Sequence, residues 1–583
     1  MDNGLKEYNV KNLTILISLA TLAVLNGCGG TETPATTVAQ ASKSRAAAVA
    51  MPDSESARVA ADVLSAGGNA VDAAVAAGFV LAVTEPEAGN IGGGGFMLIY
   101  LDGKPYFLDY RETAPLAAHR DMFLDQDGNV IRDASTMGHL SVGVPGSVAG
   151  HWEAHQRFGT LPWRDLVMPS VLLARDGFVV HPQLAENVQE VIPRYTGKTN
   201  FARYFGTVKK DEVFRQPELA EALQRIADQG TDGFYKGDTA DLIVAEMNRG
   251  SGLISHEDLE RYRAVWREPL RANWRDREIL AAPPPSSGGF AVIQLLKMKD
   301  LLAHEFDGVP HNSARYVHLV AEIEKRVFAD RAEYLGDPDY TDVPLDKLLS
   351  DDYLRRRASE VDPDKVSAVT DVRPGLESMN TTHYSVVDGD GNAVSTTTTL
   401  NLSFGSGVVV EGAGFLLNDE MDDFSVKPGV PNAYGVVGNI ANEIQPGKRM
   451  LSSMSPTILL KNNKVDFVVG TPGGSTIFTT VFQMIVNTYD FGMSPLQSAG
   501  ASRFHHQLPQ ADRITYSPTV PLPDETVSQL SEFGYRTIPH PYDYGDVQTI
   551  FRDGERWSAA SDPRKRGESR VIEIPATDQT KTD

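Results

Sequence analysis

Cysteine and positive charge are both scarce in this sequence. The 583 residues include one cysteine, Cys28, so no disulfide forms within the chain and a catalytic thiol is not expected. The 54 Lys and Arg are outnumbered by 77 Asp and Glu, and the net charge of −23 argues against a nucleic-acid surface. Charged residues at 22% and hydrophobic residues at 41% describe a globular body rather than a disordered chain.

The apolar run near the N-terminus is too short to cross a membrane as a mature helix. It spans residues 13–25, follows two lysines and leads into Leu-Asn-Gly-Cys at 25–28. This ending resembles a bacterial lipobox, in which the cysteine is lipidated and becomes the mature N-terminus. The alternative is a chance cysteine after a plain signal peptide. Residues 29–45, rich in Thr, Ala and Ser, predict a flexible tether.

The compartment follows from the same stretch. Gly29 rather than Asp after the cysteine resembles outer-membrane sorting in Gram-negative bacteria. We therefore expect an extracytoplasmic protein that is either periplasmic or anchored by lipid and facing the periplasm. One acyl chain binds membranes marginally, so lasting attachment depends on the several chains of a lipoprotein.

A threonine-rich hairpin is predicted in the second half of the chain. Two runs rich in Thr, Val and Tyr, 381–387 and 393–399, flank a Gly/Asp/Asn cluster. If the five residues between them form the loop, the ladder places Thr381 opposite Thr399. The simplest interpretation is an ordinary strand pair.

The alternative is that Thr381 becomes a chain terminus through cleavage after Asn380. Thr381 would then carry a hydroxyl and a free α-amine on one residue, which makes a nucleophile with its own base. An α-amine titrates near pH ~7.7–8.0, close to where a general base works best. The hairpin alone does not decide between the two.

Two glycine clusters have different predicted roles. Residues 92–95 are four glycines without the residues of a phosphate-binding loop, so we expect close backbone packing or a substrate-facing loop. Gly473 and Gly474 lie between a predicted strand, 465–469, and a helix that begins near residue 476. Backbone N–H groups there are suited to hold a tetrahedral oxyanion, although a glycine turn made for packing is equally compatible.

Arg111 lies just past a predicted hairpin that covers residues 96–110. A lone arginine at a strand end is usually a solvated charge. The same position also suits a guanidinium that binds a carboxylate through two parallel hydrogen bonds.

No metal site is predicted. The acidic cluster 418–424 has no neighbouring histidine, and 388–399 departs from a calcium loop at its sixth and twelfth positions. His505 and His506 are expected to be structural because adjacent residues of a strand point in different directions. Long apolar stripes, including that of the helix predicted after Ser313, indicate core. The irregular residues 425–450 are typical of a lid or binding loop.

Several long segments in matching order resemble the bacterial γ-glutamyltranspeptidases, which are N-terminal nucleophile hydrolases. The resemblance covers about residues 48–564. It is carried by the segments 67–74, 89–97, 108–115, 283–289, 381–387, 428–434, 451–456, 471–475 and 503–506.

The resemblance implies a precursor that cleaves itself between Asn380 and Thr381. It would yield a large subunit, 46–380, and a small one, 381–583, which form one heterodimer with a shared αββα sandwich. A length of 583 residues would otherwise suggest about four domains. No cofactor is implied.

The resemblance also implies residue roles. Thr381 is the nucleophile, Thr399 hydrogen-bonds it, and Gly473 and Gly474 hold the oxyanion. Tyr434 belongs to the lid. The substrate α-carboxylate would be held by Arg111, Ser452 and Ser453, and its α-ammonium by Asn401, Glu420 and Asp423.

The implied donor is glutathione or another γ-glutamyl amide, and the acceptor is water, an amino acid or a dipeptide. One arginine with two hydroxyls suits a carboxylate, and acidic residues suit an ammonium. Glu420 stands where glutamine is common in bacterial members. It still accepts hydrogen bonds from an ammonium, so recognition should survive with altered affinity.

Two other functions compete with this one. A glutaryl or cephalosporin acylase of the same superfamily would leave Glu420 and Asp423 with no cation to bind, at a desolvation cost. An inactive, lipid-anchored binding protein is disfavoured because Thr381, both oxyanion glycines and Arg111 are all present.

Overall fold

The threonine-rich hairpin has the predicted register. The computed structural model describes residues 45–368, 381–508 and 510–574, so Cys28 and Asn380 lie outside the described residues. Strand β9 (Thr381–Val387) pairs antiparallel with β10 (Ala393–Thr399), and Thr381 lies opposite Thr399. The Asp388 carboxylate stabilises the turn by accepting hydrogen bonds from the N–H groups of Asp390 (2.9 Å) and Asn392 (3.0 Å).

This hairpin lies at the centre of a seven-stranded antiparallel sheet in the described part of the chain. Its order is β18-β1-β9-β10-β2-β3-β6. The remaining strands are β1 (Arg45–Met51), β2 (Gly94–Leu101), β3 (Lys104–Tyr110), β6 (Val265–Arg267) and β18 (Glu568–Ile574).

A second antiparallel sheet of six described strands has the order β17-β16-β12-β11-β8-β7. These strands are β7 (Leu270–Trp274), β8 (Arg277–Ala281), β11 (Thr457–Lys461), β12 (Lys464–Gly470), β16 (Gln548–Asp553) and β17 (Arg556–Ser561). Both sheets contain strands from both sides of the predicted cleavage point. The two predicted fragments therefore share hydrogen-bonded sheets.

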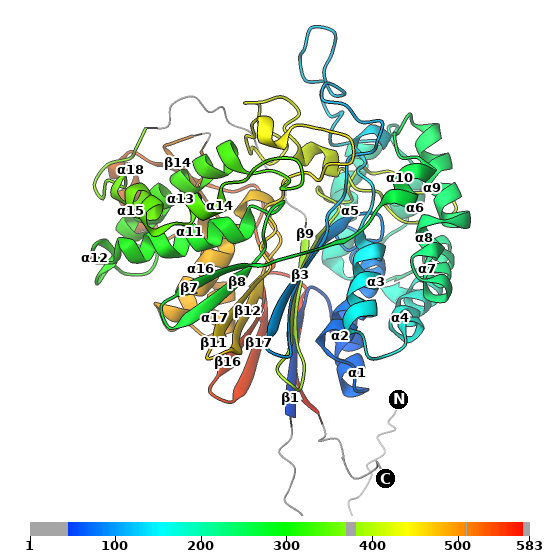
Figure 1. Cartoon of the computed structure of the whole chain (residues 1–583), viewed down its shortest axis with the longest axis horizontal. Helices are drawn as coiled ribbons and strands as arrows, with labels where there is room; N and C mark the ends of the chain where they lie inside the picture. The colour runs from blue at the N-terminus through cyan, green and yellow to red at the C-terminus, as the bar shows by residue number, and fades with distance from the viewer. Residues whose placement is uncertain (1–44, 369–380, 509, 575–583) are drawn as a thin grey trace, which may run out of the picture. The chain divides into compact units, whose positions relative to one another are not determined.

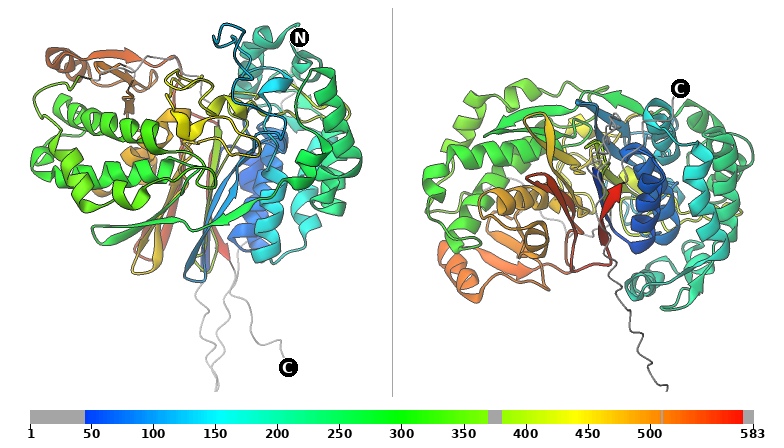
Figure 2. Two further views of the ribbon diagram at one scale, coloured as in Figure 1. Left: turned by 45° about the horizontal axis from the view of Figure 1, so that its top comes forward. Right: turned by 90° about the horizontal axis from the view of Figure 1, so that it is seen from below.

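Three separate hydrophobic cores define four layers. Ala48 and Ala50 of β1 point toward the second sheet, whereas Ala47 and Val49 point toward helices, as the two-residue period of a strand requires. A third core joins the outer face of the second sheet to its own helices. This is the predicted αββα sandwich, and Figures 1 and 2 show the sheets face to face between the helical layers.

The helices of the first layer cover the seven-stranded sheet. The longer ones are α1 (Ser54–Ser65), α2 (Ala70–Thr84), α3 (Ser147–Phe158), α4 (Trp163–Asp176), α5 (Pro182–Tyr195), α7 (Pro217–Gln229) and α9 (Gly237–Arg249). The short ones are α6 (Phe201–Phe205), α8 (Asp232–Tyr235) and α10 (His256–Arg261).

The helices of the second layer cover the six-stranded sheet. They include α11 (Gly288–Leu301), α13 (Ala314–Tyr334), α15 (Asp351–Ser359), α16 (Ile477–Tyr489), α17 (Pro495–Gly500) and α18 (Asp524–Phe533). Short helices α12 (Ala303–Phe306) and α14 (Leu345–Leu348) complete this part. Small sheets are formed by β4 (Phe178–Val179) with β5 (Val213–Phe214), and by β13 (Phe504–His505), β14 (Arg513–Tyr516) and β15 (Arg536–Pro539).

Local capping signals explain several helix starts. Asn69 and Ser255 each form a capping box, and Ser313 accepts from the N–H of Tyr316 to start α13. The first helix, α1, begins at Ser54 because the Asp53 side chain caps it by accepting from the Ser56 N–H. No helix among the described residues combines the length and the apolarity needed to cross a membrane.

Candidate active site

Thr381 and Thr399 meet at one end of the sandwich. Thr381 is the first residue of β9 and Thr399 the last of β10, and both are almost completely buried. Their hydroxyl oxygens are 3.4 Å apart, and the Asn401 N–H donates to the Thr399 hydroxyl at 2.8 Å. The predicted contact between the two threonines is present. Asn401 supports it from a left-handed backbone conformation (φ 77°) that asparagine tolerates.

The four glycines at 92–95 hold the neighbouring backbone close to this pair. A Cβ at Gly93 would lie 2.1 Å from the Thr399 carbonyl oxygen, and one at Gly92 would lie 2.1 Å from that of Leu416. The Asn90 side chain completes the support by donating to the Thr399 carbonyl at 2.8 Å. This agrees with the predicted close packing rather than a phosphate cradle.

A turn with two glycines follows β12 and reaches the same end of the sandwich. Gly473 and Gly474 have φ values of 140° and 54°, a region in which residues with a side chain are strained. No acceptor among the described residues takes a hydrogen bond from either N–H group. The turn therefore presents two backbone N–H groups beside Thr381 that donate to no described residue. An oxyanion hole requires hydrogen-bond donors of this kind.

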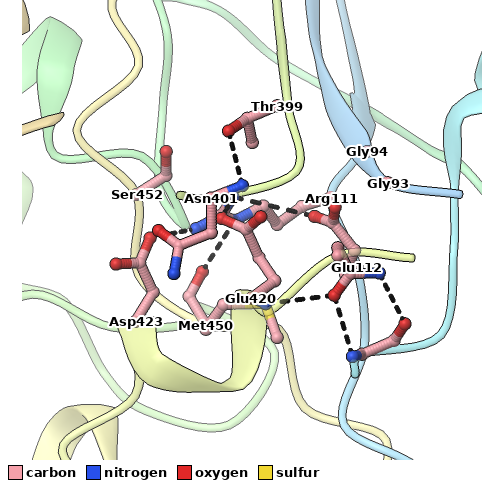
Figure 3. Close-up of polar contacts among 12 residues, drawn as sticks. Gly93, Gly94, Arg111, Glu112, Thr399, Asn401, Glu420, Asp423, Met450 and Ser452 are labelled. Atoms are coloured by element: carbon pink, nitrogen blue, oxygen red, sulfur yellow. Dashed lines mark hydrogen bonds and ion pairs between the residues drawn. The ribbon is translucent and has the colours of Figure 1, made fainter. Parts of the chain in front are cut away.

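Arg111 lies between two acidic residues of the short 3₁₀ helix Glu420–Asp423. Its guanidinium forms ion pairs with Glu420 and Asp423, and Glu112 lies 3.6 Å away. It also donates to the carbonyl groups of Met450 and Leu451 at 3.4 Å. Figure 3 shows Arg111 and Asn401 directed toward Glu420 and Asp423, which lie on the same 3₁₀ helix.

Burial controls the charges of this cluster. It would lower the pKa of Arg111 on its own, but the carboxylates of Glu420, Asp423 and Glu112 raise that pKa above its ordinary value. Burial also raises the pKa of Glu420 and Asp423, against the opposing effect of Arg111, and raises that of Glu112 to about 7. Arg111 therefore stays charged, while its acidic partners bind protons more readily than exposed carboxylates do.

Ser452 is held by the proline-rich connector 283–289, and Ser453 is contacted by an arginine of α13. The Ser287 N–H and hydroxyl both donate to the Ser452 carbonyl, at 2.8 and 2.7 Å. The Ser453 hydroxyl accepts from Arg331 at 3.3 Å.

Arg331 is a site residue that the sequence analysis missed. It is 6% exposed and donates to Ser287 and Ser453, and no carboxylate lies within 4.0 Å of its guanidinium among the described residues. Burial lowers its pKa to about 10, and Asp423 opposes this shift. A signal was present: Arg331 follows Val327 by four residues and so interrupts the apolar stripe of α13 with a charge.

The loop at 425–450 covers this cluster. The Tyr434 hydroxyl donates to the Asn401 carbonyl at 2.6 Å, and its ring packs on Gly474, where a Cβ would lie 2.5 Å from the ring. Asn432 ties the loop to the acidic residues by donating to Asp423 at 3.1 Å.

One small cavity gathers these side chains. Its volume is about 20 Å³, enough for about one water molecule. Among the predicted site residues, its lining includes Arg111, Thr381, Thr399, Asn401, Glu420, Asp423, Tyr434, Ser452, Ser453 and Gly474. Two acceptor atoms buried here, Oδ1 of Asn401 and Oε2 of Glu420, have no hydrogen-bond partner among the described residues. The site therefore offers acceptors for a ligand with donor groups.

The two adjacent histidines do not belong to this site. His505 contacts Thr479 at 3.0 Å, and His506 contacts the Arg513 carbonyl at 2.8 Å. Burial lowers the pKa of both to about 3, so both are neutral at ordinary pH. They are structural, as expected.

Sequence comparisons give a consistent result. The family profile described as Gamma-glutamyltranspeptidase matches residues 56–572. The glutathione hydrolase proenzyme of Pseudomonas aeruginosa is 57% identical over 525 residues, which cover 90% of this chain and 94% of the relative.

Structural comparisons extend this likeness to solved proteins. A γ-glutamyltranspeptidase from Pseudomonas nitroreducens, solved with L-DON, is 56% identical with a TM-score of 0.54, and covers 54% of this chain and 95% of its own. A cephalosporin acylase from Bacillus halodurans is 26% identical with a TM-score of 0.78, and covers 93% of this chain and 98% of its own.

Proposed function

Because the chain belongs to the γ-glutamyltranspeptidase family, we propose that it removes the γ-glutamyl group from glutathione and other γ-glutamyl amides and passes it to water, an amino acid or a dipeptide. It is an autoprocessed N-terminal nucleophile hydrolase and acyltransferase.

Cleavage between Asn380 and Thr381 would release the α-amine of Thr381. This amine takes the proton of the Thr381 hydroxyl as the oxygen attacks the γ-carbonyl carbon of the donor, and then gives it to the leaving amine. Thr399, with its oxygen 3.4 Å away, orients the attacking hydroxyl. The fragments 46–380 and 381–583 would remain together, because separating them would break both sheets.

The carbonyl oxygen gains negative charge in the tetrahedral intermediate. The N–H groups of Gly473 and Gly474 are the donors for that charge, since they are buried beside Thr381 and donate to no described residue. Such preorganised donors stabilise the transition state because they need no reorientation when the charge appears.

Recognition of the α-ammonium rests on one observation: Oδ1 of Asn401 and Oε2 of Glu420 are buried acceptors without partners. A buried unpaired acceptor costs about 1–3 kcal/mol, so a ligand ammonium that donates to both is favoured. The α-carboxylate would be held by Arg111 with Ser452 and Ser453. In doing so it would compete with Glu420 and Asp423 for the Arg111 guanidinium.

These acceptors also separate the proposal from the acylase alternative. We expect release of aniline from a γ-glutamyl anilide to exceed release from the glutaryl anilide by at least about 100-fold in kcat/KM, because the glutaryl group leaves the ammonium site unpaired. Initial rates with the two substrates measure this ratio, with the Thr381→Ala chain as background. Equal rates, or a preference for glutaryl, would contradict the γ-glutamyl assignment.

We also propose that the mature protein is anchored through lipid on Cys28 and faces the periplasm, as the sequence at 25–29 suggests. The expressed full-length protein should then partition into the detergent phase of Triton X-114, while Cys28→Ser stays in the aqueous phase. Two acyl chains or more make that partition strong. If the unaltered protein stays in the aqueous phase, the proposed lipid anchor is wrong. The proposed γ-glutamyl transfer does not depend on this result.

A further inference from the structure

Two arginines of the described chain line the cavity beside Thr381, and their charges are balanced in different ways. The guanidinium of Arg111 forms ion pairs with Glu420 and Asp423. Arg331 is 6% exposed, and its guanidinium forms no ion pair within 4.0 Å with any described residue. The charge of Arg111 is therefore compensated before a ligand enters, whereas that of Arg331 has no anion beside it.

The side chain of Arg331 donates hydrogen bonds to hydroxyl groups. Nε donates to Ser287 at 2.9 Å and Nη2 to Ser453 at 3.3 Å, while Nη1 donates to no described residue. A buried guanidinium with neutral partners costs free energy, because it has lost water without gaining an anion. Burial lowers the pKa of Arg331 to about 10, and the negative charge of Asp423 opposes this shift only in part. An anionic group of a ligand would supply the missing partner.

Arg331 also sets the direction of two hydroxyl protons. A hydroxyl that accepts a hydrogen bond from a guanidinium has its own proton turned away from that cation. The Ser287 hydroxyl accordingly donates to the Ser452 carbonyl at 2.7 Å. The Ser453 hydroxyl lines the cavity and donates to no described residue, so its proton is available to an acceptor on a ligand.

We propose that Arg331 is a second cation of the donor site, which attracts the α-carboxylate of the γ-glutamyl group and holds Ser453 so that its hydroxyl donates to that carboxylate. This inference rests on the proposed γ-glutamyl transfer. It adds to that function a residue that makes the site select donors whose α-carboxylate is free.

A second cation explains how a carboxylate enters a site that already holds several acidic groups. Arg111 alone contributes one positive charge beside the carboxyl groups of Glu112, Glu420 and Asp423. Arg331 adds another, and the substrate brings an ammonium of its own. The ligand carboxylate then pairs with the two arginines while the ammonium pairs with the acidic residues, so the charged groups of the site acquire partners of opposite sign.

The test compares two donors that differ in one group: a γ-glutamyl anilide, and the same anilide with a carboxamide in place of the α-carboxylate. In Arg331→Gln we expect KM for the γ-glutamyl anilide to rise about 10–100-fold, the effect of losing one hydrogen-bonding charge, with less than about a threefold change in kcat. For the carboxamide, kcat/KM should change less than about threefold, because a neutral group gains little from a cation. Initial rates per cleaved molecule, with cleavage quantified on a denaturing gel, measure these changes.

Arg331→Lys keeps the positive charge but not the planar fork that reaches both hydroxyls. Its KM for the γ-glutamyl anilide should lie between those of the unaltered enzyme and Arg331→Gln. Arg331→Lys also carries the test if Arg331→Gln does not cleave itself, since its preference for the carboxylate over the carboxamide should still fall by about threefold or more.

Arg315→Gln is the matched control. Arg315 lies on the same helix, α13, is partly exposed and pairs with Glu305 and Asp364, and it does not line the cavity. Its loss should leave the constants for both donors unchanged.

Two results would overturn the role of Arg331. One is an unchanged preference for the carboxylate donor in both Arg331 variants. The other is an equal loss with the two donors, which a purely structural arginine would produce. Failure of the unaltered protein to hydrolyse the γ-glutamyl anilide would instead refute the proposed function, and the role of Arg331 with it.

Discussion

Thr381→Ala leaves the chain uncut and lowers γ-glutamyl turnover by at least about 10⁴-fold. Alanine has no hydroxyl to attack either the preceding peptide bond or a donor amide, so one change removes both reactions. No other described hydroxyl replaces it, because Thr399 at 3.4 Å carries no free amine. A denaturing gel and an anilide assay on the same preparation measure the two effects.

Thr381→Ser is the matched control because serine keeps both the hydroxyl and the amine. It should cleave and turn over substrate, although more slowly. Sequencing the small fragment of the unaltered protein should read Thr-Thr-His-Tyr-Ser. Two fragments from Thr381→Ala, or another first residue in the small fragment, would refute the assignment of the nucleophile. An uncut but correctly folded unaltered protein would instead favour an inactive binding protein.

Gly474→Ala is expected to lower kcat about 10²–10³-fold, the cost of losing one oxyanion donor. The added Cβ would lie 2.5 Å from Cδ1 of Tyr434, and the backbone at φ 54° is strained for alanine. Relief of that contact moves both the N–H of Gly474 and the lid tyrosine. The kcat per cleaved molecule, with cleavage quantified on a gel, isolates this effect from maturation.

Gly308→Ala is the matched control for Gly474→Ala, because it introduces the same kind of backbone strain without a steric clash with a neighbouring side chain. Gly308 is exposed, has φ 66°, and a Cβ there would meet no atom within 4 Å. This variant should lose roughly 1 kcal/mol of stability and keep its kcat. Full turnover by Gly474→Ala, or an equal loss in Gly308→Ala, would show that the glycine turn does not hold the oxyanion.

Local features of the fold were predictable because local rules govern them. A five-residue turn and the alternation of strand side chains place Thr381 opposite Thr399, which the structure confirms. The helix start at Ser313 was predictable for the same reason. The roles of the site residues came from family resemblance instead, since Arg111 in isolation reads as a solvated strand-end charge.

Site residues that are far apart in the sequence were harder to predict. Arg331 lies on a helix whose stripe predicts core, and its guanidinium reaches Ser453, 122 positions away in the chain. Glu87 and Lys565 show no shared motif, yet they line one cavity beside Thr381. No periodicity or spacing relates such residues, because packing between layers brings them together.

By itself, the sequence determined the hairpin, its register and the presence of a threonine able to serve as nucleophile and base. Only the tertiary structure determined which charged side chains line the cavities next to Thr381. The reason is physical: backbone hydrogen bonds and caps depend on neighbouring residues, whereas the three cores of the sandwich set the distances between segments hundreds of residues apart.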